Sequence, residues 1–145
     1  MLCRHRIAFD LDETLGCPVI DRNGTIVDFS WRYGASALLE RLHHHYELVL
    51  WTVSPRRYAV QALSFAPFAK LFTEVLTWDE LASDPKDIRK ANVALLVDDS
   101  AHHRNAVPKS LAHRYVIVPA VGSARDRAQP ELWIRIVEDA LKHHG

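Results

Sequence analysis

The stretch IAFDLDETL, residues 7–15, decides the fold class of this chain. Three apolar residues lead directly into Asp10 and Asp12, so a short buried strand over residues 6–10 would end at two like charges. Crowded carboxylates repel and raise each other's pKa unless a cation neutralises them. Two aspartates this close together often only form a turn or cap a helix, so a functional interpretation needs support from other residues of the chain.

Length and composition favour one compact domain over residues 1–145, because 48% of the residues are apolar and can form a real core. Lys and Arg together number 18, as do Asp and Glu, which argues against nucleic-acid and membrane-surface partners. Cys3 and Cys17 show neither metal spacing nor a disulfide framework. No uncharged apolar run reaches about 18 residues, and the start lacks a signal-peptide core. We therefore expect a cytoplasmic protein without a membrane segment.

Hydrophobic patterning predicts strands that alternate with helices. The pair Asn23-Gly24 within residues 19–27 indicates a hairpin whose two turn residues both need positive φ. This alternation is typical of an α/β fold, a Rossmann-like three-layer sandwich with a central, mostly parallel sheet. The other expected elements are strands over 47–52, 72–76, 92–97 and 114–118, helices over 36–45, 55–64, 66–71 and 130–143, and helix or loop over 100–111.

Three of the predicted strands end in polar residues. Parallel sheets bind ligands at the carboxyl ends of their strands, where this chain has Asp10 and Asp12, then Thr52, then Asp98 and Asp99. A hard divalent ion such as Mg²⁺ would neutralise carboxylates gathered there and take water and phosphate as further ligands. One aspartate could then attack phosphorus while a second protonates the leaving oxygen. The strand ends together predict a site for phosphoryl transfer.

Four motifs carry a resemblance to a known superfamily. DLDETL at 10–15 resembles the first motif, DxDx[TV], of the haloacid dehalogenase (HAD) superfamily of phosphatases. Together with LWTVSPRRYA at 50–59, it is similar to the carboxy-terminal-domain phosphatase branch, the FCP/SCP or NLI-interacting-factor-like group. KDI at 86–88 and LLVDDS at 95–100 resemble the third and fourth motifs of that branch. The small architecture also resembles the capless magnesium-dependent phosphatase group.

The resemblance implies roles for the residues of the first two motifs. Asp10 would be the nucleophile that takes the phosphoryl group, with its other oxygen on Mg²⁺. Asp12 would be the general acid and then the general base, and its backbone carbonyl would also contact the metal. Thr52 would donate a hydrogen bond to the transferring phosphoryl oxygens. Glu13 and Thr14 are interpreted as residues that shape the turn.

The third and fourth motifs contribute a lysine and two further carboxylates. Lys86 would neutralise charge on the nucleophile and the phosphate, with Lys70 and Lys90 as nearby competitors for this role. Asp98 and Asp99 would both lie near Mg²⁺, and either could be the direct ligand. Asp99 stands where many relatives of the branch have asparagine.

The gaps between the motifs are too short for a cap domain, which closes over small substrates in many members of this superfamily. Residues 16–46 have room for the hairpin and one helix, and residues 55–86 for one or two helices and a strand. We therefore expect an open site suited to a bulky phosphorylated substrate such as a phosphoprotein. The alternatives are a nucleic-acid 3′-phosphate, a small phosphorylated metabolite, or a non-catalytic phosphate- or partner-binding module on the same fold. No pattern indicates an oligomeric state.

Two histidine clusters invite a functional interpretation. The run His43-His44-His45 ends a predicted helix, and we interpret it as a solvated helix end rather than a metal site. His102 and His103 follow the fourth motif directly. A solvated loop is favoured for them over a place at the mouth of the site.

Overall fold

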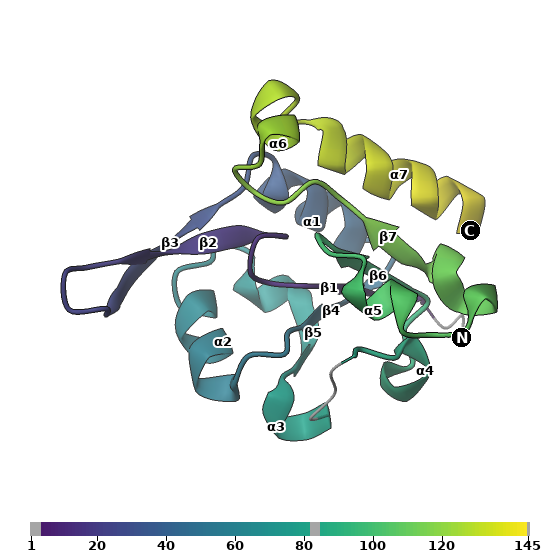
Figure 1. The fold of residues 1–145 in the computed structure, drawn as a ribbon, viewed down its shortest axis with the longest axis horizontal. Helices are drawn as coiled ribbons and strands as arrows, with labels where there is room; N and C mark the ends of the chain where they lie inside the picture. Colours follow the sequence, from purple (N-terminus) through teal and green to yellow (C-terminus); the bar gives the residue numbers. More distant parts are fainter. Residues whose placement is uncertain (1–3, 82–84, 145) are drawn as a thin grey trace.

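An all-parallel sheet of five strands forms the centre of the computed structural model, which describes residues 4–81 and 85–144. The order is β5-β4-β1-β6-β7, so β1 lies in the middle (Figure 1). The predicted α/β fold is therefore confirmed. The sheet contains β1 (Arg6–Phe9), β4 (Glu47–Trp51), β5 (Phe72–Leu76), β6 (Leu95–Asp98) and β7 (Tyr115–Ile117), and a separate antiparallel pair contains β2 (Gly16–Ile20) and β3 (Ile26–Trp31).

Helices cover both faces of the sheet because β1 buries side chains on both. Ile7 packs in one cluster with Leu38 and Trp133, whereas Ala8 packs on the opposite face with Ile88. Burying a large apolar side chain contributes about 1.5–3 kcal/mol, so apolar residues fill the middle of the sheet, and the buried carboxylates Asp10 and Asp98 lie at strand ends. The helices are α1 (Ala35–His43), α2 (Arg56–Leu63), η1 (Ala69–Leu71), α3 (Trp78–Leu81), α4 (Ile88–Ala91), α5 (His102–Asn105), η2 (Lys109–Arg114), α6 (Ala124–Ala128) and α7 (Leu132–His144).

The structure differs from the sequence prediction mainly at the ends of elements. The strand predicted over 92–97 begins at Leu95, because Asn92 takes a left-handed conformation, with φ of 53°, that ends α4. The helix predicted over 66–71 is reduced to the 3₁₀ turn η1. The short helices α3, α4 and α6 were not predicted, since segments of four or five residues have no measurable helical periodicity.

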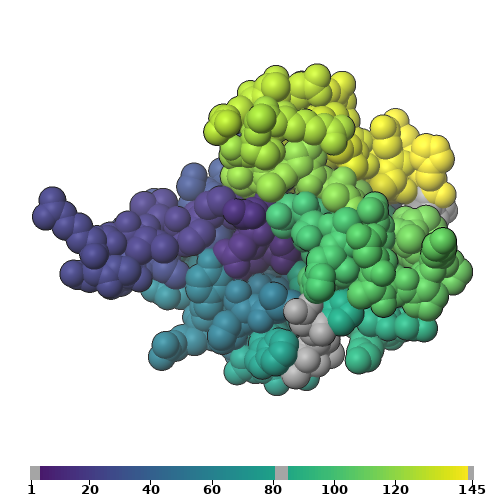
Figure 2. All heavy atoms as spheres, in the orientation of Figure 1, coloured from purple at the N-terminus to yellow at the C-terminus, as the bar shows by residue number. Residues whose placement is uncertain are grey.

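The predicted hairpin over 19–27 is present, and β2 and β3 project from the body of the molecule (Figures 1 and 2). Its turn is longer than expected. Gly24 has positive φ of 78°, whereas Asn23 does not. The side chain of Asp21 instead accepts hydrogen bonds from the backbone N–H groups of Asn23 and Thr25, at 2.8 and 2.9 Å. The prediction that both Asn23 and Gly24 have positive φ was therefore wrong.

The carboxyl edge of the sheet carries no cap domain in the part of the chain that the structure describes. Between β1 and β4 lie the β2-β3 hairpin and α1, and between β4 and Lys86 lie α2, η1, β5 and α3. The prediction from the short gaps is thus confirmed. No described helix is long and apolar enough to cross a membrane.

Arg32 ties the loop after β1 to the C-terminal part of the chain. Its side chain is 1% exposed and donates to the carbonyl oxygens of Thr14 and Pro119, both at 2.9 Å, and to Asp126 Oδ1 at 2.8 Å. The guanidinium also lies over the ring of Trp133, 4.6 Å from its centroid. A buried charge needs such partners, so this network holds the loop in one position.

Removing the carboxylate of this network should destabilise the protein. We expect Asp126→Ala to lower the free energy of unfolding by about 2–4 kcal/mol, because it leaves the buried Arg32 charge without its ion pair. Urea denaturation measures the change. Glu138→Ala is the matched control, since its ion pair with Arg41 is exposed and should contribute less than about 1 kcal/mol. Equal losses in the two variants would contradict the role assigned to the network.

Candidate active site

Three carboxylates meet at the carboxyl edge of the sheet. Asp10 follows β1, while Asp98 ends β6 and Asp99 follows it, and these two strands are paired in parallel. One oxygen from each carboxylate lies within 4.8 Å of the others. The backbone N–H of Asp10 donates to the carbonyl oxygen of Val97 at 2.9 Å, which fixes the end of β1 against β6. Residues nearly 90 positions apart are brought together because neighbouring parallel strands end at the same edge.

Lys86 lies fully buried beside these carboxylates. Its Nζ is 2.7 Å from Asp10 Oδ1 and 3.6 Å from Asp98 Oδ2. Such a charge is stable in the protein interior only when it is paired in this way. Lys70 and Lys90 are exposed. Of the three lysines considered from the sequence, the structure therefore brings Lys86 to the site.

The hydroxyl of Thr14 links two of the carboxylates. Its Oγ1 lies 3.0 Å from Asp10 Oδ2 and 3.0 Å from Asp99 Oδ1, and the residue is fully buried. The carbonyl of the same residue accepts the hydrogen bond from Arg32. Thr14 does shape the turn, and in addition it directly contacts the carboxylates of Asp10 and Asp99. This second role was not predicted from the sequence.

The carboxylate of Asp12 lies apart from the three-carboxylate group and has its own partners. It accepts hydrogen bonds from the hydroxyl of Tyr58 and, at 3.5 Å, from the hydroxyl of Ser54. Burial and the charge of Asp10 raise the pKa of Asp12, while the hydrogen bond from Tyr58 opposes the shift. Ser54 and Tyr58 were not predicted from the sequence. Tyr58 lies in the first turn of α2 and Ser54 two residues before that helix begins, so their place in the segment that directly follows β4 was the signal available.

Thr52 lies at the same edge, after β4, the strand on the other side of β1. It is buried, and its N–H donates to the carbonyl oxygen of Leu76 at 2.9 Å. Its Oγ1 accepts a hydrogen bond from the backbone N–H of Ser54 at 3.1 Å. That bond leaves the hydrogen of the hydroxyl itself for another acceptor.

His103 is buried behind the lysine, so the expectation of a solvated loop was wrong for this residue; His102 is exposed. His103 Nδ1 accepts the hydrogen bond of the Lys86 N–H at 2.8 Å, and its Nε2 lies 3.9 Å from Asp98 Oδ2. The carbonyl of Lys86 accepts a hydrogen bond from the hydroxyl of Tyr115 at 2.8 Å. The backbone of the lysine is thus held on both sides.

The cluster of Asp10, Asp98 and Asp99 carries more negative charge than Lys86 can neutralise. Burial, then the charge of Asp10, raises the pKa of Asp99 to about 7 and also raises the pKa of Asp98. Asp98 Oδ2 is buried and has no hydrogen-bond partner among the described residues. An all-oxygen donor set with an unsatisfied carboxylate oxygen fits a hard divalent cation such as Mg²⁺.

Comparison with known protein families gives a match over most of the chain. The model of the NLI interacting factor-like phosphatase family matches residues 6–114. All six residues that the sequence predicted for the site lie within this range. No sequence among the curated proteins matches the chain significantly.

Solved structures share the fold. The RNA polymerase II CTD phosphatase Fcp1 of fission yeast, bound to beryllium fluoride, is 19% identical with a TM-score of 0.57. The match covers 93% of this chain and 51% of that chain, so this chain spans about half the length of the solved Fcp1 chain. A haloacid dehalogenase-like family hydrolase from Xanthomonas campestris is 11% identical with a TM-score of 0.57, and the match covers 96% and 98% of the two chains.

A third solved structure contains a metal ion. The 3-deoxy-D-manno-octulosonate 8-phosphate phosphatase from Moraxella catarrhalis, in complex with magnesium, phosphate and KDO, is 15% identical with a TM-score of 0.51. The match covers 92% of this chain and 87% of that chain. At such identities these likenesses show the fold, which is the Rossmann-like fold of the HAD hydrolases.

The crowded carboxylates predict that the metal-free protein loses stability as the pH rises. The pKa of Asp99 is about 7 in the folded protein and 3.8 for an ordinary aspartate, so between these values the folded state retains a proton that the unfolded state has released. Stability therefore falls as the pH rises through this window. In EDTA we expect the melting temperature to fall by a few degrees between pH 5 and pH 8, and Mg²⁺ to reverse most of the loss.

Asp99→Asn isolates this effect, because the amide keeps the shape of the side chain and cannot ionise. We expect the variant in EDTA to show a flatter dependence of melting temperature on pH than the wild-type protein, measured by scanning calorimetry. The same slope in both proteins would show that Asp99 does not titrate in this window.

Proposed function

Because the chain belongs to the NLI interacting factor-like phosphatase family, we propose that it is a Mg²⁺-dependent phosphomonoesterase that works through an aspartyl-phosphate intermediate. The observation that carries the proposal is the buried contact of 2.7 Å between Lys86 Nζ and Asp10 Oδ1, with Asp98 and Asp99 beside it. This geometry supplies a fixed carboxylate nucleophile, a positive charge next to it and a place for a metal.

Asp10 is the nucleophile in this proposal. Lys86 holds one of its carboxylate oxygens and Thr14 lies against the other, so its orientation is set before substrate arrives. A carboxylate oxygen of Asp10 attacks phosphorus, the bond from phosphorus to the ester oxygen breaks, and the phosphoryl group remains on Asp10. The charge of Lys86 lowers the repulsion between the two anions as they approach.

Asp12 is the general acid in the first half-reaction and the general base in the second. Burial raises its pKa, which favours the protonated carboxyl needed to give a proton to the leaving oxygen. Tyr58 and Ser54 fix the orientation of this carboxyl through their hydroxyl groups. In the second half, Asp12 takes a proton from the water that attacks phosphorus. The bond between phosphorus and the Asp10 oxygen then breaks, which releases phosphate and restores both carboxyl groups.

The remaining residues bind the metal and the phosphoryl group. Asp10, Asp98, Asp99 and the backbone carbonyl of Asp12 would hold Mg²⁺, which when bound neutralises charge on the phosphoryl oxygens. The hydroxyl of Thr52 is a donor for one of those oxygens, since its bond with Ser54 leaves its hydrogen unused.

A phosphorylated protein segment is the substrate class that we propose. The described part of the chain has no cap over the site, and two apolar side chains lie at its edge: Val53 is 40% exposed and Trp78 is 47% exposed. The backbone N–H of Trp78 donates to the carbonyl oxygen of Ser54, and the hydroxyl of Ser54 donates to Asp12. Exposed apolar groups beside an open site suit a peptide better than a small sugar phosphate.

Substitution of the nucleophile and of the lysine tests the mechanism. With a generic aryl phosphate, we expect Asp10→Asn to lower kcat/KM by at least about 1,000-fold, and Lys86→Met by at least about 100-fold. EDTA should abolish turnover by the wild-type protein. Lys90→Met, an exposed lysine on α4, is the matched control and should not change the kinetics. Full activity of Asp10→Asn, or in EDTA, would exclude the proposed mechanism.

A substrate panel tests the substrate class. We expect a higher kcat/KM for phosphoserine peptides than for a 3′-phosphorylated oligonucleotide or for sugar phosphates under the same Mg²⁺ concentration. Preference for the oligonucleotide or for a sugar phosphate would replace the protein substrate by that class. Tight Mg²⁺-dependent phosphate binding without turnover of any compound would instead indicate a binding module.

A further inference from the structure

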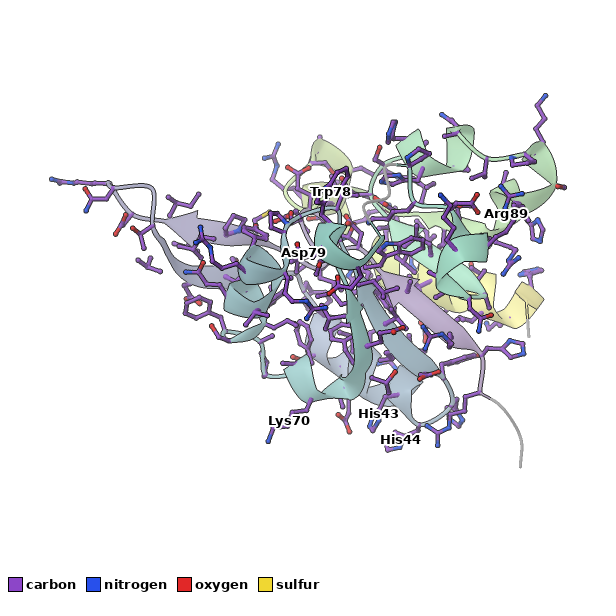
Figure 3. The ribbon with its side chains drawn as sticks, turned by 90° about the horizontal axis from the view of Figure 1, so that it is seen from below. His43, His44, Lys70, Trp78, Asp79 and Arg89 are labelled. Carbon is purple, nitrogen blue, oxygen red and sulfur yellow. The ribbon has the colours of Figure 1, made fainter. Side chains whose placement is uncertain are left out.

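Two histidines and a glutamate converge at the C-terminal end of α1. His43 Nε2 lies 3.3 Å and His44 Nε2 lies 3.7 Å from the same oxygen, Glu40 Oε1. The imidazole rings are neighbours, with centroids 4.2 Å apart, and Figure 3 shows the two side chains together. The sequence alone favoured a solvated helix end here; from this convergence we infer instead that Glu40, His43 and His44 form a second metal site, for a transition-metal ion such as Zn²⁺.

The separations of the donor atoms match the size of such an ion. Zinc lies about 2.0–2.1 Å from imidazole nitrogen and about 2.0–2.2 Å from carboxylate oxygen, which places two ligands of a tetrahedron about 3.3–3.5 Å apart. The two distances from Glu40 to the histidines are close to this range. All three ligand atoms lie within 4.8 Å of one another, so modest side-chain rotation can place them around one ion.

Helix α1 places the three ligands on one side and ends in an electrostatic field that favours a cation. Residues three and four positions apart face the same side of a helix, which brings His43 and His44 back over Glu40. The last carbonyl groups of a helix carry partial negative charge, which favours a cation at this end. One nearby cation opposes it: Arg4 Nη1 donates to the carbonyl oxygen of His43 at 2.9 Å, and so uses the backbone rather than the ring.

The donor set selects a different class of metal from the one proposed for the active site. Imidazole nitrogens favour Zn²⁺, Ni²⁺, Co²⁺ and Cu²⁺, whereas Mg²⁺ prefers oxygen ligands alone. The side chains of Glu40 and His44 are 60% and 62% exposed. An ion held there would have its remaining coordination position open to water or to a ligand from another molecule.

The two sites lie at opposite edges of the sheet. His44 precedes the start of β4 at Glu47 by three residues, whereas the carboxylates of the active site follow the ends of β1 and β6. In Figure 3 the labelled His43 and His44 lie at the opposite end of the molecule from Trp78, which follows the carboxyl end of β5. Each site can therefore be filled without the other.

Calorimetric titration with Zn²⁺ tests the inference, with Mg²⁺ in excess to fill the active site. We expect one zinc site in the wild-type protein whose affinity falls at least about tenfold in His43→Ala, His44→Ala and Glu40→Gln, since each loses a direct ligand. His45→Ala is the matched control. It removes an exposed imidazole from the next position, outside the cluster, and should leave zinc affinity unchanged.

The inference is overturned if His45→Ala weakens zinc binding as much as His43→Ala, or if none of the cluster variants weakens it. Circular dichroism should show that all four variants are folded, because the substituted side chains are at least partly exposed. Phosphatase activity with Mg²⁺ should be the same in His44→Ala as in the wild-type protein. Zinc affinity and phosphatase turnover are thus separate measurements. A negative result for the zinc site would not contradict the proposed phosphatase activity, and the reverse also holds.

Discussion

The buried pair formed by Lys86 and Asp10 is the interaction on which the rest of the site depends. An ammonium group that is fully buried requires carboxylates around it, and crowded carboxylates in turn require positive charge. The fold meets both needs by placing the lysine where β1 and β6 end. His103 and Tyr115 then hold the lysine backbone on either side. The orientation of the Asp10 carboxylate is consequently set by the folded core.

The fold and the acidic part of the site could be predicted from the sequence because their signals are local. The apolar run before Asp10 and the one before Asp98 each predict a buried strand, and parallel strands bring such ends to one edge. Lys86 has no such signal of its own. Its assignment came from resemblance to a motif, and the structure separates it from Lys70 and Lys90 by burial.

What the sequence could not predict depends on contacts between distant segments. His103 looked like part of a solvated loop because its burial depends on the neighbouring segment around Lys86, 17 residues away. Tyr58 reaches Asp12 across 46 residues. The turn at Asn23 differs from the expected type because a single side chain, Asp21, offers its oxygen to two backbone amides. Local patterns contain no information on such pairings.

The Arg32 network shows that residues beyond the end of the family match contribute to the same packed structure. The match stops at residue 114, yet β7 completes one side of the sheet, and Arg32 finds its carboxylate and its aromatic partner in α6 and α7. A fragment cut at that point would leave a buried guanidinium group without its counter-ion and one face of the sheet without Trp133. The part of the sequence that matches the phosphatase family is thus shorter than the part of the chain whose packing supports the loop after β1.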